Sequence, residues 1–321
     1  MRILITGGAG FIGSHLAESL LKDDGYQVTV LDDLSTGRKE NIEHLLANPN
    51  FSFIEGNVLD YKLVMKLVTE CDCIYHFAAA VGVKYIIDNP LDSLITNVRG
   101  TEIVLEIAQI FEKKIFFASS SEVYGKDGTS AFKEDDDRIL GAVSLSRWGY
   151  AFSKGFDEFL AMAYYRTKGL KVVIGRLFNI CGQRQSANYG MVVPRFVKQA
   201  IANEPITVYG DGQQGRSFIH VWDAVSAIKG LMNESRSEGE IFNIGSPDSI
   251  KIVDLAKKIK DYSGSTSQVS FIPYNEVYEK NFEDMLYRVP DISKIKNLTG
   301  FTPKLNLDEM IKVIIDDYRS K

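Results

Sequence analysis

The feature that most constrains the fold of this chain is its first stretch, MRILITGGAGFIGS, residues 1–14. Residues 2–6 form a short apolar run rich in β-branched side chains, which indicates a buried strand. Gly7, Gly10 and Gly13 follow, with Phe11 and Ile12 among them, and an amphipathic run comes next. A strand that turns on glycines into a helix points free N–H groups and the positive end of the helix dipole at one place. The stretch predicts a dinucleotide site, with Gly7 in the turn, Gly10 beside the phosphates and Gly13 packing helix on strand.

Asp32 is the second sign of a dinucleotide site, because it ends a second apolar run at residues 27–31. A carboxylate at the end of the second strand can accept hydrogen bonds from an adenosine ribose and repels a 2′-phosphate. We therefore expect NAD rather than NADP. The alternative is an ordinary turn residue, since another acid, Asp33, stands beside it.

Composition excludes several classes of partner. The 321 residues carry a net charge of −5, so the chain has no basic field for nucleic acid. Cys71, Cys73 and Cys181 lie in or beside apolar runs and are interpreted as core thiols in a reducing compartment. No apolar run approaches the roughly 18 residues of a membrane span, and no signal peptide precedes the first strand. We expect a cytoplasmic protein with no metal site, no nucleic acid and no membrane contact.

Strand-like and helix-like segments alternate through the first half of the chain. Further strands are expected at residues 51–56, 73–79, 114–120 and 171–177, a short helix before residue 51, and longer helices at about 91–111 and 150–167. This alternation predicts an α/β fold with a Rossmann-type doubly wound parallel sheet and ligands beyond the carboxyl ends of its strands.

The second half is less regular and predicts a smaller α/β substrate-binding lobe. It contains a strand at residues 268–273 between two short helices, and a final helix from about residue 307. We divide the chain into an NAD-binding domain, residues 1–177 with about 217–244 returning to it, and a nucleotide-sugar-binding lobe of residues 178–216 and 245–321.

Tyr150 and Lys154 are the first candidates for catalysis, because positions i and i+4 at the start of a helix share one face. Upstream, the strand at 114–120 runs into Ser120, Ser121 and Glu122. A tyrosine acts as a base near neutral pH only when its pKa falls well below ~10, and a nearby ammonium and a cationic nicotinamide both lower it. A serine hydroxyl opposite completes a short proton path. The alternative is a common pair on a helix surface.

A series of motifs then identifies a resemblance. GGAGFIG, HFAAA, NVRGT, SSSEVYG, YAFSK, the FN of GRLFN, YGDG, RSFIHVWD and VPDISK stand in the order found in the extended short-chain dehydrogenase/reductases. Those proteins are NAD-dependent nucleotide-sugar epimerases, dehydratases and decarboxylases. The resemblance covers essentially the whole chain and is much less specific to one reaction.

The resemblance implies a common first step. Tyr150 would take the proton of a sugar hydroxyl, usually at C4, while hydride passes from that carbon to tightly held NAD. Lys154 would bind the nicotinamide ribose and lower the Tyr150 pKa, and Ser120 would hold the same hydroxyl. Further cofactor positions implied are Asn57, Val58, Ala78, Ala80 and Asn97; Asn57 stands where the family usually has an aspartate that contacts adenine. Substrate positions implied are Lys84, Ser121, Glu122, Asn179, Arg184, Val193, Val208, Tyr209, Arg216 and Arg288.

Glu122 and Arg288 bear on the net reaction. Simple 4-epimerases often carry a neutral residue in place of Glu122, and dTDP-glucose dehydratases have Asp-Glu where this chain has Ser121-Glu122. Ser-Glu is similar to the decarboxylases, which also place an arginine at the position of Arg288 to face a sugar carboxylate. Against this, HFAAAVGV departs from the decarboxylases' proline-rich stretch, and Glu283 and Asp284 stand in a longer loop near the arginine. A structural ion pair of Glu122 with Arg288 is the plain alternative.

The leading expectation is a UDP-sugar 4-epimerase, because that is the broad default of the family. UDP-glucuronate decarboxylase comes next, followed by a dehydratase or C4 dehydrogenase; a catalytically silent, cofactor-bound regulatory protein is the alternative of another class. The expected partners are a nucleotide-diphosphate sugar, with UDP favoured, and a second copy of the chain packed through residues 91–111 and 150–167, as the resemblance implies.

Overall fold

A computed structural model describes residues 1–82, 86, 88–126, 130–187, 191–277 and 285–320. Its centre is a seven-stranded parallel sheet in the order β11-β6-β5-β4-β1-β2-β3. The strands are β1 (Arg2–Thr6), β2 (Gln27–Asp32), β3 (Phe51–Glu55), β4 (Cys73–His76), β5 (Lys114–Ser120), β6 (Val172–Leu177) and β11 (Glu240–Ile244). The predicted doubly wound α/β fold is confirmed. The strand order reverses between β1 and β4, the place where such sheets bind ligands.

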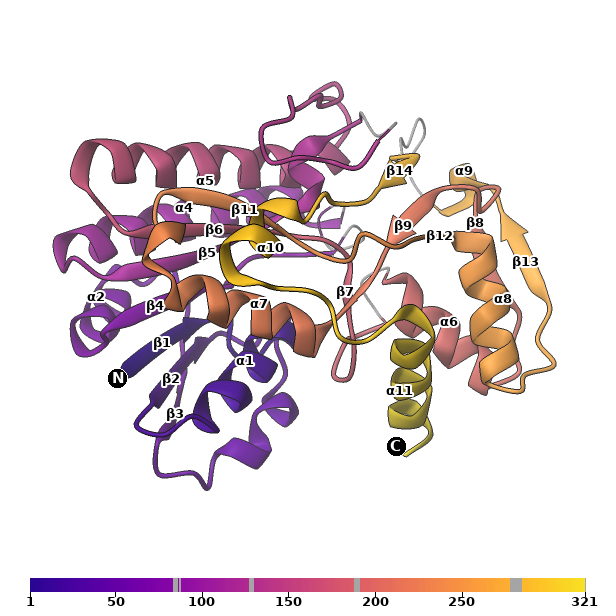
Figure 1. The fold of residues 1–321 in the computed structure, drawn as a ribbon, viewed down its shortest axis with the longest axis horizontal. Helices are drawn as coiled ribbons and strands as arrows, with labels where there is room; N and C mark the ends of the chain where they lie inside the picture. Colours follow the sequence, from indigo (N-terminus) through magenta and orange to yellow (C-terminus); the bar gives the residue numbers. More distant parts are fainter. Residues whose placement is uncertain (83–85, 87, 127–129, 188–190, 278–284, 321) are drawn as a thin grey trace.

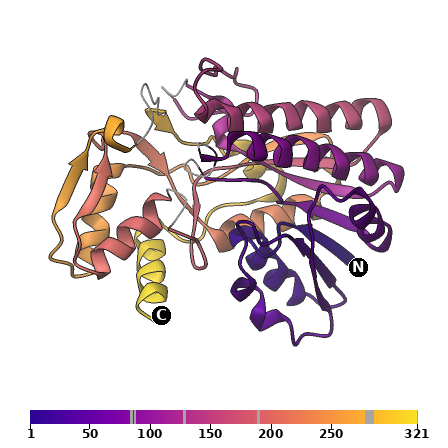
Figure 2. The same ribbon diagram turned by 180° about the vertical axis from the view of Figure 1, so that it is seen from behind.

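Helices cover both faces of this sheet (Figures 1 and 2). One face carries α1 (Phe11–Leu21) and α7 (Val221–Asn233), whose apolar side chains join one buried cluster with β1 and β2. The other face carries α2 (Tyr61–Glu70), α4 (Pro90–Ile110) and α5 (Arg147–Lys168), which share a second cluster with β4 and β5. Burial on both faces explains why the central strands are apolar runs rather than alternating patterns.

A smaller lobe stands beyond the carboxyl ends of the sheet, on the right in Figure 1. Its helices are α6 (Val192–Ile201), α8 (Ile252–Tyr262), α9 (Tyr274–Val277) and α11 (Leu307–Arg319), and its core is separate from those of the sheet. Short strands connect it: β7 (Ile180–Cys181) with β10 (Ile219–His220), β8 (Ile206–Tyr209) with β13 (Val269–Ile272), and β9 (Gly215–Ser217) between β12 (Ser249–Lys251) and β14 (Tyr287–Arg288).

The chain returns from this lobe to the sheet twice. β11 pairs in parallel with β6 at the sheet edge, and α10 (Ser293–Thr299) packs against β11 and α7. That the sheet domain binds NAD and the smaller lobe binds the nucleotide sugar remains our proposal.

Two local expectations are wrong. The segment between β2 and β3 forms two short 3-10 turns, η1 (Lys39–Asn41) and η2 (Glu43–Leu45), in place of a helix. Pro49 follows closely and disfavours helical backbone at the residue before it, which leaves too little length for stable α-helical turns. The catalytic helix α5 begins at Arg147, three residues before Tyr150.

The three cysteines are free and buried. Within the described residues, no helix is long and apolar enough to cross a membrane.

Candidate active site

The glycine turn has the geometry that its sequence predicts. Gly7 has φ +72°, a left-handed conformation, and a Cβ there would lie 2.6 Å from the backbone N of Ala78. A Cβ on Gly13 would lie 2.4 Å from the carbonyl O of Gly7. Any larger side chain at either position would push β1, α1 and the end of β4 apart. The turn therefore brings the free N–H groups at the start of α1 to the wall of the main cavity, which Gly10, Phe11 and Ile12 also line.

Asp32 lies at the carboxyl end of β2, buried beside this turn. Its Oδ2 accepts a hydrogen bond from Ala9 N at 2.9 Å, and its Oδ1 accepts one from Leu34 N at 2.9 Å. Burial raises the pKa of Asp32, and those amide hydrogen bonds act in the opposite direction. A carboxylate has about four acceptor sites, so two bonds to the backbone leave capacity for a ribose. Asp32 is both a structural residue of the turn and a fit for an adenosine ribose.

The adenine side of the cavity contains the altered position Asn57. Its Nδ2 donates to Asp33 Oδ2 at 2.8 Å, and its Oδ1 accepts from Leu59 N at 2.8 Å. An aspartate at 57 would face Asp33 as a like charge, so the amide suits the neighbouring acid. Asn57 and Val58 both line the cavity.

The end of β4 forms the floor beneath the nicotinamide position. Ala78 and Ala80 line the cavity. Asn97 of α4 accepts from Ala80 N at 2.7 Å and donates back to Ala80 O at 3.3 Å. Asn97 thus shapes the backbone of the cavity wall at Ala80 and does not itself line the cavity.

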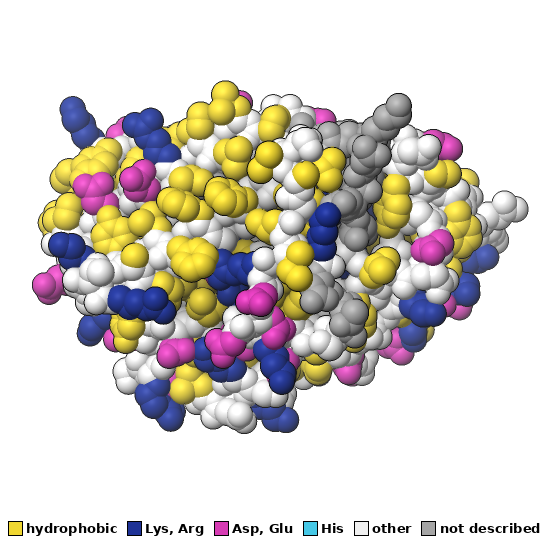
Figure 3. All heavy atoms as spheres, turned by 90° about the horizontal axis from the view of Figure 1, so that it is seen from above, with side chains coloured by type: hydrophobic (Ala, Val, Ile, Leu, Met, Phe, Trp, Pro, Cys, Tyr) yellow, Lys and Arg dark blue, Asp and Glu magenta, His cyan; other side chains and the backbone are white. Residues whose placement is uncertain are grey.

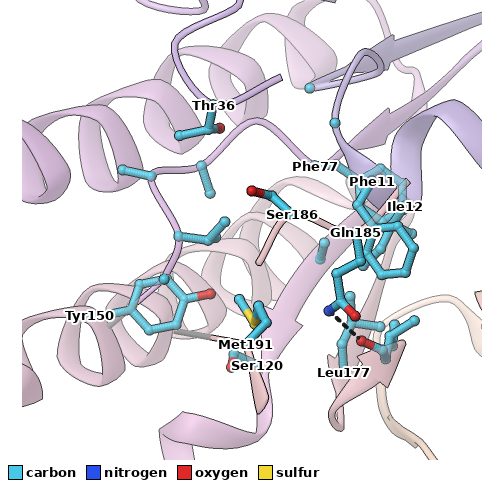
Figure 4. Close-up of a pocket in the computed structure, with 18 of the residues that line it drawn as sticks. Phe11, Ile12, Thr36, Phe77, Ser120, Tyr150, Leu177, Gln185, Ser186 and Met191 are labelled. Atoms are coloured by element: carbon cyan, nitrogen blue, oxygen red, sulfur yellow. Dashed lines mark hydrogen bonds between the residues drawn. The ribbon is translucent and has the colours of Figure 1, made fainter. Parts of the chain in front are cut away.

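Apart from Asn97, the predicted cofactor residues described above border one cavity of about 650 Å³ that joins the sheet to the smaller lobe. Figure 4 looks into it: Phe11, Ile12 and Phe77 lie on one side, and Tyr150 lies across from them with its hydroxyl directed inward. Ser120 and Met191 lie between the two sides in this view. The cavity is therefore continuous from the dinucleotide turn to the predicted proton path.

Tyr150, Lys154 and Ser120, the three residues of the expected proton path, all line this cavity. Tyr150 is hydrogen-bonded to Ser120, whose Oγ also accepts from Glu122 N at 3.2 Å. Burial raises the pKa of Tyr150; the Ser120 hydrogen bond opposes this, and the charge of Glu122 adds to it. The Lys154 Nζ lies 4.7 Å from the centre of the Phe117 ring. Without the positive charge of a nicotinamide, the protein alone holds Tyr150 as a neutral phenol.

Glu122 is placed between two arginines in the cavity wall. Its Oε1 pairs with Arg288 Nη1, and its Oε2 accepts from Arg147 Nη2 at 3.1 Å. Burial alone would raise the pKa of Glu122, but the charges of Arg288, Arg147 and Arg216 outweigh it and lower the pKa to about 2. Glu122 is therefore ionised throughout the neutral range and cannot donate a proton in this arrangement. Ser121 is buried in the same wall.

Arg288 also contacts Asn179, another of the implied substrate positions. Its Nη2 donates to Asn179 Oδ1 at 2.7 Å, while Asn179 Nδ2 donates to Ser217 O at 2.8 Å. Arg216 lies in the same wall, with Nη1 donating to Gly215 O at 2.9 Å. Asn179 and Arg216, two of the implied substrate positions, thus lie with Arg288 in one wall of the cavity.

The candidates for binding the base divide into two groups. Val193 and Tyr209 line the cavity, whereas Val208 lies in the core of the smaller lobe. The guanidinium of Arg195 stacks on the Tyr209 ring, 3.7 Å from its centre. Sequence reasoning missed Arg195, although it follows Pro194 at the start of an amphipathic helix.

Arg184 takes a different place from the one expected. Its Nη2 pairs with Glu18 of α1, and its Nη1 donates to Ser14 Oγ at 3.4 Å. It therefore lies on the dinucleotide side of the cavity rather than beside the sugar, because its left-handed backbone (φ +66°) turns the loop toward α1. Lys84, Glu283 and Asp284 lie outside the described residues.

Arg147 is the other functional residue that the sequence reasoning missed. It stands three residues before Tyr150 on α5, so the i, i+3 spacing that places both on one face was available as a signal. What it contacts, Glu122, is visible only in three dimensions.

Comparison with known proteins gives the family. The model of a family described as GDP-mannose 4,6 dehydratase matches residues 4–314. The chain belongs to this family. The prediction of an NAD-dependent enzyme of the extended short-chain dehydrogenase/reductase class is confirmed with it.

Relatives in this family differ in reaction. A UDP-N-acetyl-alpha-D-glucosaminuronate decarboxylase of Bacillus cytotoxicus is 42% identical over 319 residues, covering 99% of this chain and 98% of the relative. UDP-glucuronic acid decarboxylase 1 of Xenopus tropicalis is 37% identical, covering 100% of this chain and 72% of its own. The solved UDP-glucuronic acid 4-epimerase of Bacillus cereus, in complex with UDP-glucuronic acid and NAD, has a TM-score of 0.89 at 29% identity, covering 100% and 99% of the two chains.

Proposed function

We propose that this chain decarboxylates a UDP-linked hexuronate, after oxidising the sugar at C4, to give a UDP-linked pentose. The cofactor is NAD, and the glycine turn, Asp32 and Lys154 are the residues that would hold it. The observation that carries the proposal is Arg288: a guanidinium at the sugar end of the cavity that is not committed to a single partner. Its Nη1 and Nη2 contact Glu122 and Asn179, and its buried Nε has no hydrogen-bond partner among the described residues.

The charge of the substrate end supports an acidic sugar. Four arginines line it, Arg147, Arg195, Arg216 and Arg288, whereas among the described residues at this end the carboxylate is Glu122. The diphosphate of a nucleotide sugar carries two negative charges, and a uronate adds a third, which matches the excess of arginines over the carboxylate. A planar guanidinium can bind a carboxylate through two parallel hydrogen bonds in a site that excludes water.

The chemistry follows from the residues in place. Bound NAD supplies the hydride acceptor for oxidation at C4 and the hydride for the final reduction. Tyr150 accepts the C4 hydroxyl proton, and Ser120 holds the oxygen that carries it. A ketone at C4 makes the uronate a β-keto acid, so the C5–C6 electron pair can move toward the C4 oxygen as CO₂ leaves. C5 would then take up a proton from water, which restores the C4 ketone before it is reduced. The hydroxyls of Tyr150 and Ser120 lie where they can stabilise the charge that develops on that oxygen.

Lys154 and Glu122 act on different groups in this scheme, Lys154 on the cofactor and Glu122 on the two arginines. Lys154 would bind the nicotinamide ribose and lower the pKa of Tyr150 in the loaded site. Glu122, which stays ionised, orients Arg288 and Arg147 rather than donating protons.

Decarboxylation takes the place of plain 4-epimerisation as our first choice. The neutral-sugar epimerase that the sequence favoured gives Arg288 no anion to hold, and the two curated relatives described above are named as decarboxylases of UDP-uronates. UDP-glucuronate and UDP-N-acetylglucosaminuronate are the two substrates we propose to compare. The second candidate is 4-epimerisation of a uronate, which the fold similarity to the Bacillus cereus epimerase favours.

Product analysis distinguishes decarboxylation from 4-epimerisation. The purified protein is incubated with both UDP-uronates and with UDP-glucose, and released CO₂ is followed together with the mass and configuration of the sugar. CO₂ with a UDP-pentose is the expected result. A 4-epimeric uronate without CO₂ would favour the second candidate, and turnover of UDP-glucose alone would contradict a carboxylate-binding role for Arg288.

We also propose a homodimer through α4 and α5, which pack on each other. Phe152 and Phe159 of α5 are 61% and 71% exposed, and Leu91 of α4 is 68% exposed. Apolar side chains gather over these helices in Figure 3, which looks down on this face. Apolar patches of this kind on two neighbouring helices are typical of a face that another surface covers, and the family resemblance supports a second copy as its occupant.

A further inference from the structure

A buried carboxylate that the reaction scheme does not use lies one helical turn after Lys154. Asp157 is fully buried on α5 and lies at i+3 from the lysine, so the two side chains share one face of the helix. Its Oδ2 accepts from Thr101 Oγ1 of α4 at 3.2 Å, and its Oδ1 has no hydrogen-bond partner among the described residues. A buried carboxylate oxygen without a donor is costly to stability, so its presence calls for a reason.

A chain of hydrogen bonds leads from Asp157 back to the floor of the cofactor site. His76 Nε2 lies 3.2 Å from Thr101 Oγ1, and His76 Nδ1 lies 2.7 Å from Thr6 Oγ1. Ala78 N, in the cavity floor, donates to Thr6 Oγ1 at 3.3 Å. The chain therefore links the end of β4 to the catalytic helix through the ends of β1 and α4.

Only one arrangement of protons satisfies this chain while Asp157 is ionised. The Thr101 hydroxyl donates to Asp157, so its oxygen must accept from His76 Nε2–H. Nδ1 of His76 then has no proton and accepts from the Thr6 hydroxyl, which in turn accepts from Ala78 N–H. Burial, together with the smaller effect of the Lys154 charge, lowers the pKa of His76 to about 3, so the ring is neutral as this arrangement needs. Every donor in the chain thus points toward the Asp157 carboxylate.

The other acid near Lys154 is already committed. Glu158 Oε2 accepts from Arg176 Nη2 at 2.9 Å and pairs with Arg138, and its Oε1 accepts from Arg176 Nε at 3.0 Å and from Ser119. The charged groups around Lys154 are therefore Asp157 and Glu158 on its own helix. The charge of Glu158 is neutralised by Arg176 of β6 and by Arg138 of the loop before α5. The neutral groups are Tyr150 on α5, His76 on β4 and Thr101 on α4. Asp157 is the carboxylate left to balance the ammonium.

We propose that Asp157 is a positioning residue whose negative charge keeps the Lys154 ammonium protonated, and that the Thr6–His76–Thr101 chain holds its carboxylate for that task. The role concerns the step shared by the whole family, proton transfer at Tyr150, and is independent of whether the sugar loses CO₂. Burial lowers the pKa of Lys154, and the charge of Asp157 is the largest influence that raises it again. Without that charge, Lys154 would lose its proton at a lower pH.

The pH dependence of kcat/KM tests this in the NAD-loaded enzyme. In Asp157→Asn, the alkaline limb, where Lys154 loses its proton, should move toward neutral pH by about 1 pH unit or more, the usual effect of removing an opposite charge at this range. Asn keeps the Thr101 bond and the side-chain volume, so a purely structural role would leave the limb in place. Thr101→Val should shift the limb in the same direction by less, and Thr101→Ser, which keeps the hydroxyl, should match the wild type.

Thermal stability gives a readout apart from activity. Burial raises the pKa of Asp157 to about 7, and the Lys154 charge and the Thr101 hydrogen bond oppose that rise. A folded-state pKa above the unfolded value of ~3.9 means that the folded chain binds more protons between about pH 4 and 7, so ionised Asp157 costs stability as pH rises through this window. The Tm of Asp157→Asn relative to wild type should therefore increase from pH 4 to pH 8.

An alkaline limb at the wild-type position in both Asp157→Asn and Thr101→Val would overturn the proposal. If Asp157→Asn does not fold, the comparison of Thr101→Val with Thr101→Ser decides by itself.

Discussion

Arg288 and Glu122 form an ion pair between residues 166 positions apart, and Arg147 holds the other carboxylate oxygen of Glu122 at 3.1 Å. The pair connects β14 of the smaller lobe to the turn that follows β5. Because Glu122 retains Arg147 when Arg288 turns to another anion, Arg288 can exchange its partner without leaving a buried charge unpaired. The proposed role of Arg288, binding a substrate carboxylate, requires such an exchange of partners.

Replacement of Arg288 by lysine should separate a carboxylate-binding role from a structural one. Lysine keeps the charge but loses the planar fork, so kcat/KM for a UDP-uronate should fall roughly 10- to 100-fold, the value of one charge-assisted hydrogen bond. Arg236→Lys, in an exposed pair with Glu234, is the matched control and should have no effect. Unchanged CO₂ release by Arg288→Lys would mean that Arg288 and Glu122 form only a structural ion pair.

Tyr150→Phe removes the base and keeps the packing of the ring. Turnover should fall by roughly 10²–10⁴-fold, the usual contribution of a general base, with little change in the binding of the nucleotide sugar. Steady-state kinetics and titration calorimetry measure the two quantities. Near-normal turnover would mean that another group takes the C4 proton.

Acid unfolding should report the ionisation of Glu122. Its folded-state pKa of about 2 lies below the ordinary value, so its contribution to stability is complete above about pH 4.5 and is lost as pH falls toward 2. Glu122→Gln should therefore unfold with a weaker pH dependence than wild type over this window. Parallel acid-unfolding curves for the two proteins would contradict the lowered pKa.

The cofactor released from the purified protein should be NAD, because Asp32 repels the 2′-phosphate of NADP. Asp32→Asn should relax this preference, and it should also destabilise the fold by about 1–3 kcal/mol since two buried amides depend on the carboxylate. Chromatography of the released nucleotide and denaturant unfolding give the two results. Recovery of mainly NADP from the wild-type protein would contradict the role of Asp32 in binding the cofactor ribose.

The exposed aromatic residues of α5 provide a test of assembly. Phe152→Ser combined with Phe159→Ser should convert a dimer to a monomer, because both rings would otherwise be buried against the second copy. Phe271→Ser, at an exposed position on β13, is the control. Light scattering after size exclusion measures the mass, and a wild-type monomer would rule out the proposed dimer.

Local sequence determined the nucleotide-binding turn and the proton path, for a physical reason. The glycines of residues 7–13 act through backbone sterics within one turn, and Tyr150 and Lys154 share a face because helical geometry fixes the i, i+4 relation. The same locality placed most strands of the sheet, whose burial on both faces leaves continuous apolar runs. The helix expected before β3 does not form, because the segment is short and Pro49 follows it closely. Only 3-10 turns form there.

Tertiary structure alone decided the contacts between distant segments. The family resemblance offered an ion pair of Glu122 with Arg288 as an alternative, and the structure contains it. No pattern in sequence says that Arg184 pairs with Glu18 of α1 or that Arg147 shares the Glu122 carboxylate. The chain from Ala78 through Thr6, His76 and Thr101 to Asp157 likewise joins two strand ends with two helices. Each of these side chains would suit a solvated surface equally well, and only the packing of the sheet, helices and smaller lobe removes them from water and fixes their partners.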